Sequence, residues 1–170
     1  MSEQLLMIAL RLLHIGAGIF WVGSVLFLNI FVLPAIQAGG PDGAKMATML
    51  MRGGRIQRVI IHSALLTIIT GFLIYGRYIM ITDGAWARTV PAMGYGVGAI
   101  AAVIAFLLGI LINAPAAKRI QHIGASHGGS LTAEQQSEMA RLRDRMSASS
   151  RLAIPLLIIA VISMAISRYL

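Results

Sequence analysis

Four long apolar stretches without a single acidic side chain dominate this chain of 170 residues. They cover about residues 5–32, 59–81, 93–117 and 152–166, and the last reaches 168 when its flank is included. A helix needs about 20 apolar residues to cross the hydrocarbon core of a bilayer. Because lipid offers the backbone no hydrogen-bond partner, helices are the favoured spanning structure. We therefore predict an all-α integral membrane protein, built as a four-transmembrane-helix bundle.

The composition indicates the same class. Hydrophobic residues make up 58% of the chain, and the mean hydropathy is +0.82. A soluble domain of this length exposes too much of its surface to hide that much apolar material. The apolar stretches also do not alternate with polar residues, as the strands of a membrane β-barrel do. We predict a single domain over residues 1–170.

Positive charge is concentrated in two of the segments that join the apolar stretches. Four basic residues follow the first stretch and six follow the third: Lys45, Arg52, Arg55, Arg58, Lys118, Arg119, Arg141, Arg143, Arg145 and Arg151. Segments rich in lysine and arginine stay in the cytoplasm, so we predict two basic cytoplasmic segments and both termini outside. This pattern is typical of a multi-pass protein of a bacterial-type cytoplasmic (inner) membrane.

The net charge of +8 is explained by this topology and by contact with the anionic lipid of the bilayer. Arginines do not alternate with aromatic residues along the chain, as they often do in proteins that read nucleic acids. The predicted partner is therefore the lipid bilayer, with no nucleic acid.

The second basic segment contains the signals of a cytoplasmic amphipathic helix over about residues 132–149. Thr132 and Gln135 have the spacing of a capping box, which opens a helix. Three apolar side chains then recur at helical spacing, Met139, Leu142 and Met146. We expect this face to dock either on its own bundle or on a partner protein.

Small residues recur every four positions along the third apolar stretch, in the series Gly94, Gly98, Ala102 and Ala101, Ala105, Gly109. Such stripes let helix backbones approach closely in lipid. Tight packing within the monomer is the first interpretation, and homo-oligomerisation is the second. A Pro-Ala pair also ends both the first and the third stretch, at Pro34 and Pro115, which suggests an internal repeat.

All six acidic residues lie outside the four apolar stretches: Glu3, Asp42, Asp83, Glu134, Glu138 and Asp144. Proton-coupled carriers usually bury a carboxylate near the middle of the membrane, so this distribution argues against a transporter. With a cysteine count of 0, the chain has no disulfide, iron–sulfur cluster or covalently attached haem.

His14 is the leading candidate for a cofactor ligand. An imidazole within the membrane usually faces the interior of the bundle, where it bonds a polar group or ligates a metal. Gly18 and Trp21 share its helical face, and the glycine leaves room for a flat macrocycle such as haem b. The alternative is that His14 only bonds a carbonyl across a helix interface.

His62, in the second stretch, is a second candidate ligand, but we do not expect it to share one haem with His14. Each histidine precedes the centre of its span by about six or seven residues, and successive spans run in opposite directions. The two imidazoles should therefore differ in depth by roughly 20 Å, whereas one iron needs each ligand nitrogen near 2 Å. We predict separate sites.

The motifs of the first two-thirds of the chain resemble a known family. Leu12-Leu13-His14 followed by Phe20-Trp21-Val22-Gly23, and then Thr70-Gly71-Phe72-Leu73, Trp86 and the glycine-rich third stretch, are similar to the copper resistance protein D-like membrane proteins. They are also similar to that family's relatives, the HemJ-type protoporphyrinogen oxidases.

The resemblance implies a helical membrane protein with a redox role that binds haem b, or alternatively copper. His14 matches the first-helix histidine of the family and would be the metal ligand. If the protein is an enzyme, it would be a HemJ-like membrane oxidoreductase. HemJ-type proteins tend to show a proline-arginine pair late in the first helix, where this chain has Leu28-Asn29-Ile30-Phe31. The alternative function is a non-catalytic accessory subunit of a larger respiratory or photosynthetic membrane complex.

Overall fold

The computed structural model describes residues 2–125 and 131–170, and this part of the chain is helical and contains no strand. Four of its helices are long and apolar enough to cross a membrane: Glu3–Ala38, Arg55–Ile81, Val90–Gly124 and Ala133–Tyr169. The predicted all-helical fold with four candidate spans is confirmed. The chain has the structure of a multi-pass membrane protein.

The first hairpin pairs α1 with α4. Its elements are α1 (Glu3–Phe27), the π-turn η1 (Leu28–Val32), α2 (Leu33–Ala38), α3 (Gly40–Met51), η2 (Arg52–Gly54) and α4 (Arg55–Ile81). The chain reverses between α2 and α3 at Gly40, which has a φ of 52°. A Cβ on Gly43 would lie 2.0 Å from the carbonyl oxygen of Ile36, so only glycine fits there.

The second hairpin pairs α5 with α7. After η3 (Trp86–Arg88) come α5 (Val90–Leu108), the π-turn η4 (Gly109–Asn113), α6 (Ala114–Ala125), α7 (Ala133–Ile166) and η5 (Ser167–Tyr169). The predicted capping box of Thr132 and Gln135 opens α7. The expected cytoplasmic helix 132–149 and the fourth span are one continuous helix of 34 residues. No glycine or proline interrupts residues 147–151, so nothing there ends the helix.

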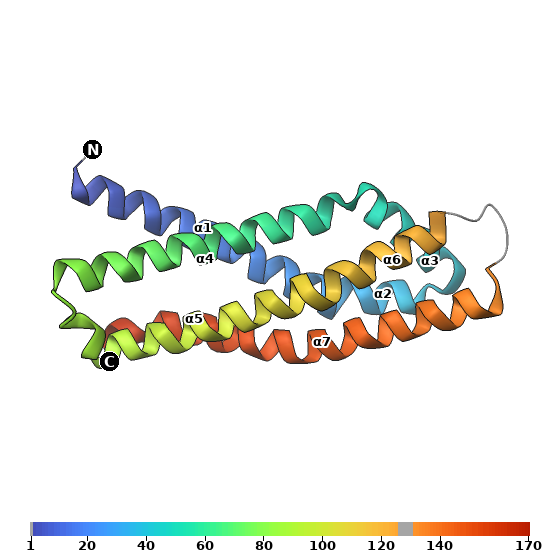
Figure 1. The fold of residues 1–170 in the computed structure, drawn as a ribbon. Helices are drawn as coiled ribbons and strands as arrows, with labels where there is room; N and C mark the ends of the chain where they lie inside the picture. Colours follow the sequence, from blue (N-terminus) through green and yellow to red (C-terminus); the bar gives the residue numbers. More distant parts are fainter. Residues whose placement is uncertain (1, 126–130) are drawn as a thin grey trace.

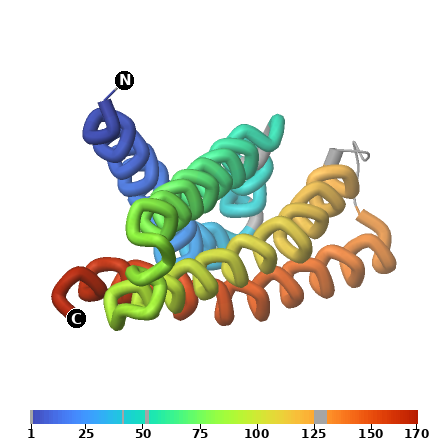
Figure 2. The backbone as a smooth tube through the Cα atoms, turned by 60° about the vertical axis from the view of Figure 1, so that its left-hand side comes forward, coloured from blue at the N-terminus to red at the C-terminus, as the bar shows by residue number. Residues whose placement is uncertain are grey.

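The two hairpins lie next to each other (Figures 1 and 2), with contacts between α4 and α5, between α1 and α7 and between α3 and α6. Both termini and the connection between α4 and α5 are at one end of the molecule, the terminal end. The α2–α3 turn, the end of α6 and the start of α7 are at the other, the basic end. Figure 2 shows the start of α1 standing apart from α5 and α7.

The hairpins meet in a core built mainly of small side chains. Trp21 of α1 is only 5% exposed, and its ring meets that of Phe106 edge-on, with centroids 6.4 Å apart. Ala64 of α4 and Leu157 of α7 belong to the same buried cluster. Alanine at most other core positions lets the helix backbones come close.

The glycine stripe of the third span packs within the chain, as the first interpretation predicted. A Cβ on Gly98 would lie 3.0 Å from Cγ of Met164 and 3.2 Å from the carbonyl oxygen of Ala160. Ser163 donates a hydrogen bond of 2.6 Å to the carbonyl oxygen of Gly94. Gly94 and Gly98 therefore join α5 to α7, and homo-oligomerisation stays a prediction.

Each hairpin contains a π-turn immediately before a proline. Leu33 N–H donates to the carbonyl oxygen of Leu28, and Pro34 follows. Ala114 N–H donates in the same way to Gly109, and Pro115 follows. A proline ring clashes with the carbonyl four residues back, and the wider turn relieves that clash. The internal repeat suggested by the two Pro-Ala pairs is therefore accompanied by a repeated local structure.

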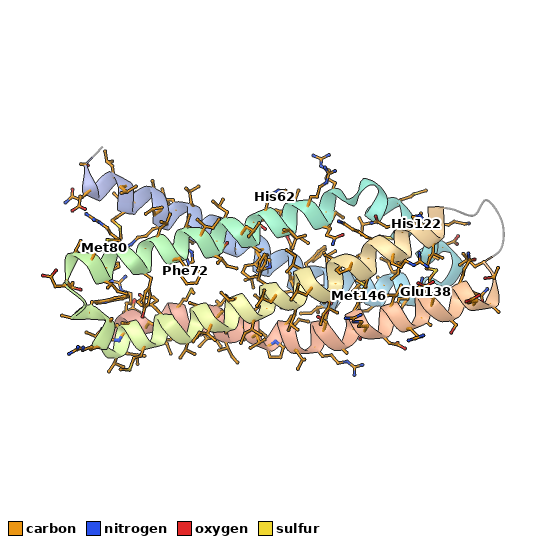
Figure 3. The ribbon with its side chains drawn as sticks, viewed as in Figure 1. His62, Phe72, Met80, His122, Glu138 and Met146 are labelled. Atoms are coloured by element: carbon orange, nitrogen blue, oxygen red, sulfur yellow. The ribbon has the colours of Figure 1, made fainter. Side chains whose placement is uncertain are left out.

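At the basic end, α6 packs against the start of α7. The guanidinium of Arg119 donates two hydrogen bonds to the carboxylate of Glu138, at 2.7 and 3.0 Å. This contact lowers the pKa of Glu138 and raises that of Arg119. Both residues lie beyond the apolar stretches of the sequence. Figure 3 shows Glu138 near the start of α7, at the basic end.

The apolar face predicted for the cytoplasmic part of α7 is half-buried, at Met139, Leu142 and Met146. This part of α7 contacts α6 of the same chain. Docking of this face on the protein's own bundle is therefore consistent with the structure, and docking on a partner protein stays a prediction. The accessory-subunit alternative, which expected contacts from the glycine faces and from this helix, also stays a prediction.

Candidate functional site

His14 lies on the seam between α1 and α4. Its Nδ1 is 2.7 Å from the carbonyl oxygen of Thr67, and the hydroxyl of Thr70 is 3.5 Å from the same nitrogen. A carbonyl oxygen only accepts, so Nδ1 must carry the proton. In the neutral ring, Nε2 then keeps its lone pair. The carbonyl bond predicted as the alternative is present, and it leaves one nitrogen available as a ligand.

The sequence of α4 makes room for this imidazole. A Cβ on Gly71 would lie 2.8 Å from Cε1 of His14 and 3.1 Å from its Nδ1. Thr67 and Thr70 are buried, and their hydroxyls donate to carbonyls one turn back in α4, at 2.8 and 2.6 Å. The two hydroxyls are thus hydrogen-bonded within α4, and Gly71 leaves the space that the His14 ring occupies.

Gly18 and Trp21, the other residues predicted to contact a cofactor, pack against protein. A Cβ on Gly18 would lie 3.4 Å from the methyl group of Thr67. Trp21 is part of the buried core. The space predicted beside Gly18 is therefore taken by Thr67, and a role of these two residues in cofactor binding stays a prediction.

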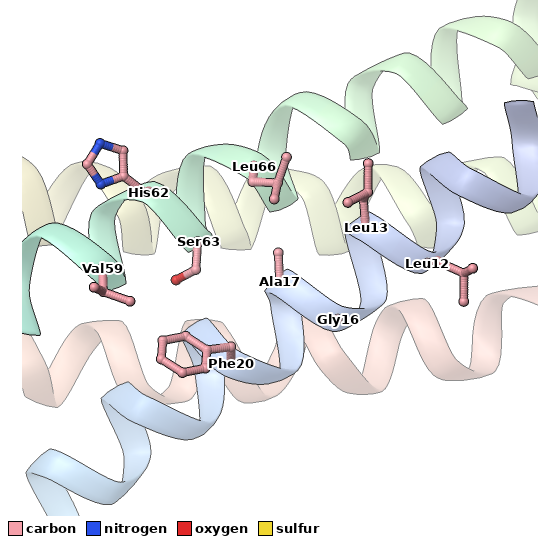
Figure 4. Close-up of a pocket in the computed structure, with 9 residues that line it drawn as sticks. All are labelled: Leu12, Leu13, Gly16, Ala17, Phe20, Val59, His62, Ser63 and Leu66. Carbon is pink, nitrogen blue, oxygen red and sulfur yellow. The ribbon is translucent and has the colours of Figure 1, made fainter.

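His62 is exposed on α4, and its Nδ1 is 2.7 Å from the carbonyl oxygen of Arg58. It stands at the rim of a shallow groove of about 500 Å³ between α1 and α4. Figure 4 shows its ring extending away from α1, while Ser63, Ala17 and Phe20 lie between the two helices. The groove is lined by Leu12, Leu13, Gly16, Ala17, Phe20, Val59, His62, Ser63 and Leu66. His14 is not in this lining.

The two histidines are closer in depth than the roughly 20 Å estimated from the sequence. His14 contacts Thr67 and Gly71, which follow His62 by five and nine positions on α4. At 1.5 Å per residue, the offset is about 7.5 to 13.5 Å. The estimate was too large because α1 is shifted along α4, so His14 faces the middle of that helix. The offset still exceeds what one iron can bridge, and separate sites stay a prediction.

The terminal end carries an aromatic cluster that the sequence analysis missed. The rings of Tyr78 and Trp86 stack with centroids 5.0 Å apart, and Tyr75 meets Trp86 edge-on at 4.9 Å. Arg11 of α1 donates to the hydroxyl of Tyr78, and its guanidinium carbon lies 6.0 Å from the ring centroid. The signal was present in the two tyrosines one turn apart, just before a loop that contains tryptophan.

Within the described residues, no group of three or more histidine, cysteine, aspartate or glutamate side chains could hold a metal ion. Among the described residues, His14 therefore belongs to no group of three or more such ligands. A bare copper ion usually needs several protein ligands. Haem iron receives its equatorial nitrogens from the porphyrin, so one protein imidazole can be enough to hold it.

No protein-family model, characterised protein or solved structure matches this chain. The resemblance to the copper resistance protein D-like proteins, on the motifs around His14 and Gly71, stays a prediction.

Proposed function

We propose that this protein is a membrane redox protein that binds haem b through Nε2 of His14. The observation that carries the proposal is the 2.7 Å contact between Nδ1 of His14 and the carbonyl oxygen of Thr67. Histidines that ligate metals almost always donate their second ring N–H to a carbonyl or carboxylate, which fixes the tautomer and orients the ring. His14 has this arrangement with the carbonyl oxygen of Thr67.

Haem b is favoured over copper because His14 belongs to no described group of three or more histidine, cysteine, aspartate or glutamate side chains. Its own ring supplies a single nitrogen, which suits a cofactor that brings its other ligands with it. Thr67 takes the space beside Gly18, so a macrocycle would have to use the partly exposed side of His14. When bound, haem supplies one-electron exchange. His14 would hold it, and Thr67 and Gly71 would position His14.

The test is an absorption spectrum of the protein purified in mild detergent from cells with ample haem. We expect a Soret band that is abolished in His14→Ala and retained in His62→Ala, the matched control on the neighbouring helix. A colourless, metal-free wild-type preparation would contradict the proposal. Bound copper without a Soret band would favour the copper alternative, and equal loss in both variants would point to a general effect on folding.

We also propose that both termini lie outside the cytoplasm, in a bacterial-type inner membrane. The ten basic residues of the two connecting segments support this orientation. Reporter fusions test it: a fusion at residue 45 or 143 should report from the cytoplasm, and a fusion at the C-terminus should report from outside. The opposite pattern would overturn the orientation.

A further inference from the structure

A second hollow between α1 and α4 lies at the terminal end, away from the contacts of His14. It has a volume of about 300 Å³ and is lined by Gln4, Met7, Ile8, Arg11, Tyr78 and Ile81. Three of these side chains are apolar and three are polar. A hollow of this kind suits a molecule with both an apolar part and a polar head.

Arg11 is held in place by the aromatic cluster. Its guanidinium donates to the hydroxyl of Tyr78 and lies close to the ring of that tyrosine, which stacks on Trp86. A cation near an aromatic face is attracted to it. The side chain is therefore already ordered, so a ligand that binds it loses little further rotamer freedom.

The positive charge of Arg11 is not neutralised by a carboxylate of the described residues. The nearest acidic residue in the sequence, Glu3, forms an ion pair with Arg77 instead. In the part of the chain that the structure describes, Arg11 makes no ion pair with a carboxylate. A guanidinium has five N–H donors and binds phosphate through two parallel hydrogen bonds.

The remaining lining completes the site. Tyr78 accepts from Arg11, so its own O–H is free to donate. The amide of Gln4 supplies further donors. Met7, Ile8 and Ile81 offer apolar surface nearer the terminal end, because they precede Arg11 on α1 or follow Tyr78 on α4.

We propose that this hollow binds an anionic phospholipid of the adjoining leaflet, with its phosphate on Arg11 and Tyr78 and its acyl chains directed from there towards the middle of the spans. Tyrosine and tryptophan concentrate where membrane meets water, which is the depth of lipid phosphate groups. The headgroup is expected to be anionic because Arg77 already neutralises Glu3, the carboxylate that an ammonium group would need. The inference does not depend on haem binding.

Native mass spectrometry of the full chain in detergent, titrated with phosphatidylglycerol, tests the proposal. We expect wild-type protein to retain the lipid and Arg11→Gln to bind it roughly tenfold to a hundredfold more weakly, the range for a charge-assisted hydrogen bond. Arg168→Gln is the matched control, because Arg168 is another exposed arginine of the terminal end that lies over a tyrosine ring. It should bind the lipid as wild type does.

Additional titrations and variants distinguish a bound lipid from a free phosphate and from a folding defect. Glycerol phosphate, which carries no acyl chain, should not compete with the lipid, and phosphatidylcholine should bind more weakly than phosphatidylglycerol. Tyr78→Phe should weaken binding roughly twofold to tenfold, and it keeps the test valid if Arg11→Gln does not fold. His14→Ala should bind the lipid normally even if it loses haem. Unchanged binding in Arg11→Gln, or equal loss in Arg168→Gln, would overturn the proposal.

Discussion

The two hairpins share a topology but differ in what fills their seams. Between α5 and α7, Gly98 is in close contact with α7, and Ser163 bonds directly to the backbone of Gly94. Between α1 and α4 lie His14, two buried threonines, an arginine–tyrosine pair and two surface hollows. The second hairpin is packed as a scaffold. The first contains the histidine, the arginine–tyrosine pair and the two hollows, which is where a ligand would be expected.

Glycine serves a different purpose in each seam. Gly98 lets two helix backbones approach, whereas Gly71 makes room for a side chain, the imidazole of His14. Substitutions at these two glycines therefore separate the scaffold from the site. Gly76 of α4 has no other heavy atom within 4 Å of where its Cβ would be, so it is the control for both.

The largest effect is expected for Gly98→Leu. A Cβ alone would already lie 3.2 Å from a backbone oxygen, so a leucine side chain must push α5 away from α7. We expect a loss of about 3 kcal/mol of the free energy of unfolding, the upper end for overpacking. Thermal and denaturant unfolding in detergent measure it. Gly76→Leu should be nearly neutral, and equal losses in both variants would remove the distinction between the hairpins.

A smaller effect is expected for Gly71→Ala. The added methyl group would lie 2.8 Å from Cε1 of His14, so the ring must move and its bond to Thr67 weakens. We expect a loss of about 1 kcal/mol, the value of one hydrogen bond, together with a changed ¹⁵N shift of His14 by NMR. Gly76→Ala should leave that shift unchanged. A wild-type shift in Gly71→Ala would mean that the glycine does not position the histidine.

The smallest effect concerns the basic end of the second hairpin. The pKa of Glu138 is lowered from its ordinary value of 4.5 by the hydrogen bonds from Arg119. The ion pair therefore contributes its stability above about pH 4.5 and loses it as the pH falls through the lowered pKa. Both side chains are exposed, so the effect on folding should be slight.

Amide exchange in α6, corrected for its intrinsic pH dependence, should accelerate as the pH falls below 4.5, the ordinary pKa of Glu138. Glu138→Gln should exchange at the faster rate throughout and show no such transition. A transition that persists in Glu138→Gln would assign it to another group.

The four spans were predictable because a run of about 20 apolar residues has few structures open to it in lipid. The capping box at Thr132 and the glycine stripe through Gly98 were equally local signals. What the sequence could not supply was the relative shift of α1 and α4. That shift depends on how Gly18 and His14 fit the threonines of α4, and the estimated depth of the two histidines changed with it.

Contacts between residues on different helices could not be predicted from the sequence either. Tyr78 and Trp86 are close along the chain, but the contact of Arg11 with Tyr78 depends on how α1 packs against α4. Trp21 was predicted to contact a cofactor, and its place in the core beside Phe106 of another helix could not be predicted from the sequence. Residues on separate helices meet through packing, which helical periodicity alone does not encode.

The two π-turns have a practical consequence for anyone who maps these helices by labelling. Each wide turn inserts one additional residue, which advances the helical phase by about 100°. A cysteine-accessibility scan through the third span should therefore follow one periodic pattern before residue 109 and a pattern displaced by one position after residue 113. The first span should show the same jump across residues 28–32, and a regular wheel drawn through either segment would assign the wrong side chains to lipid.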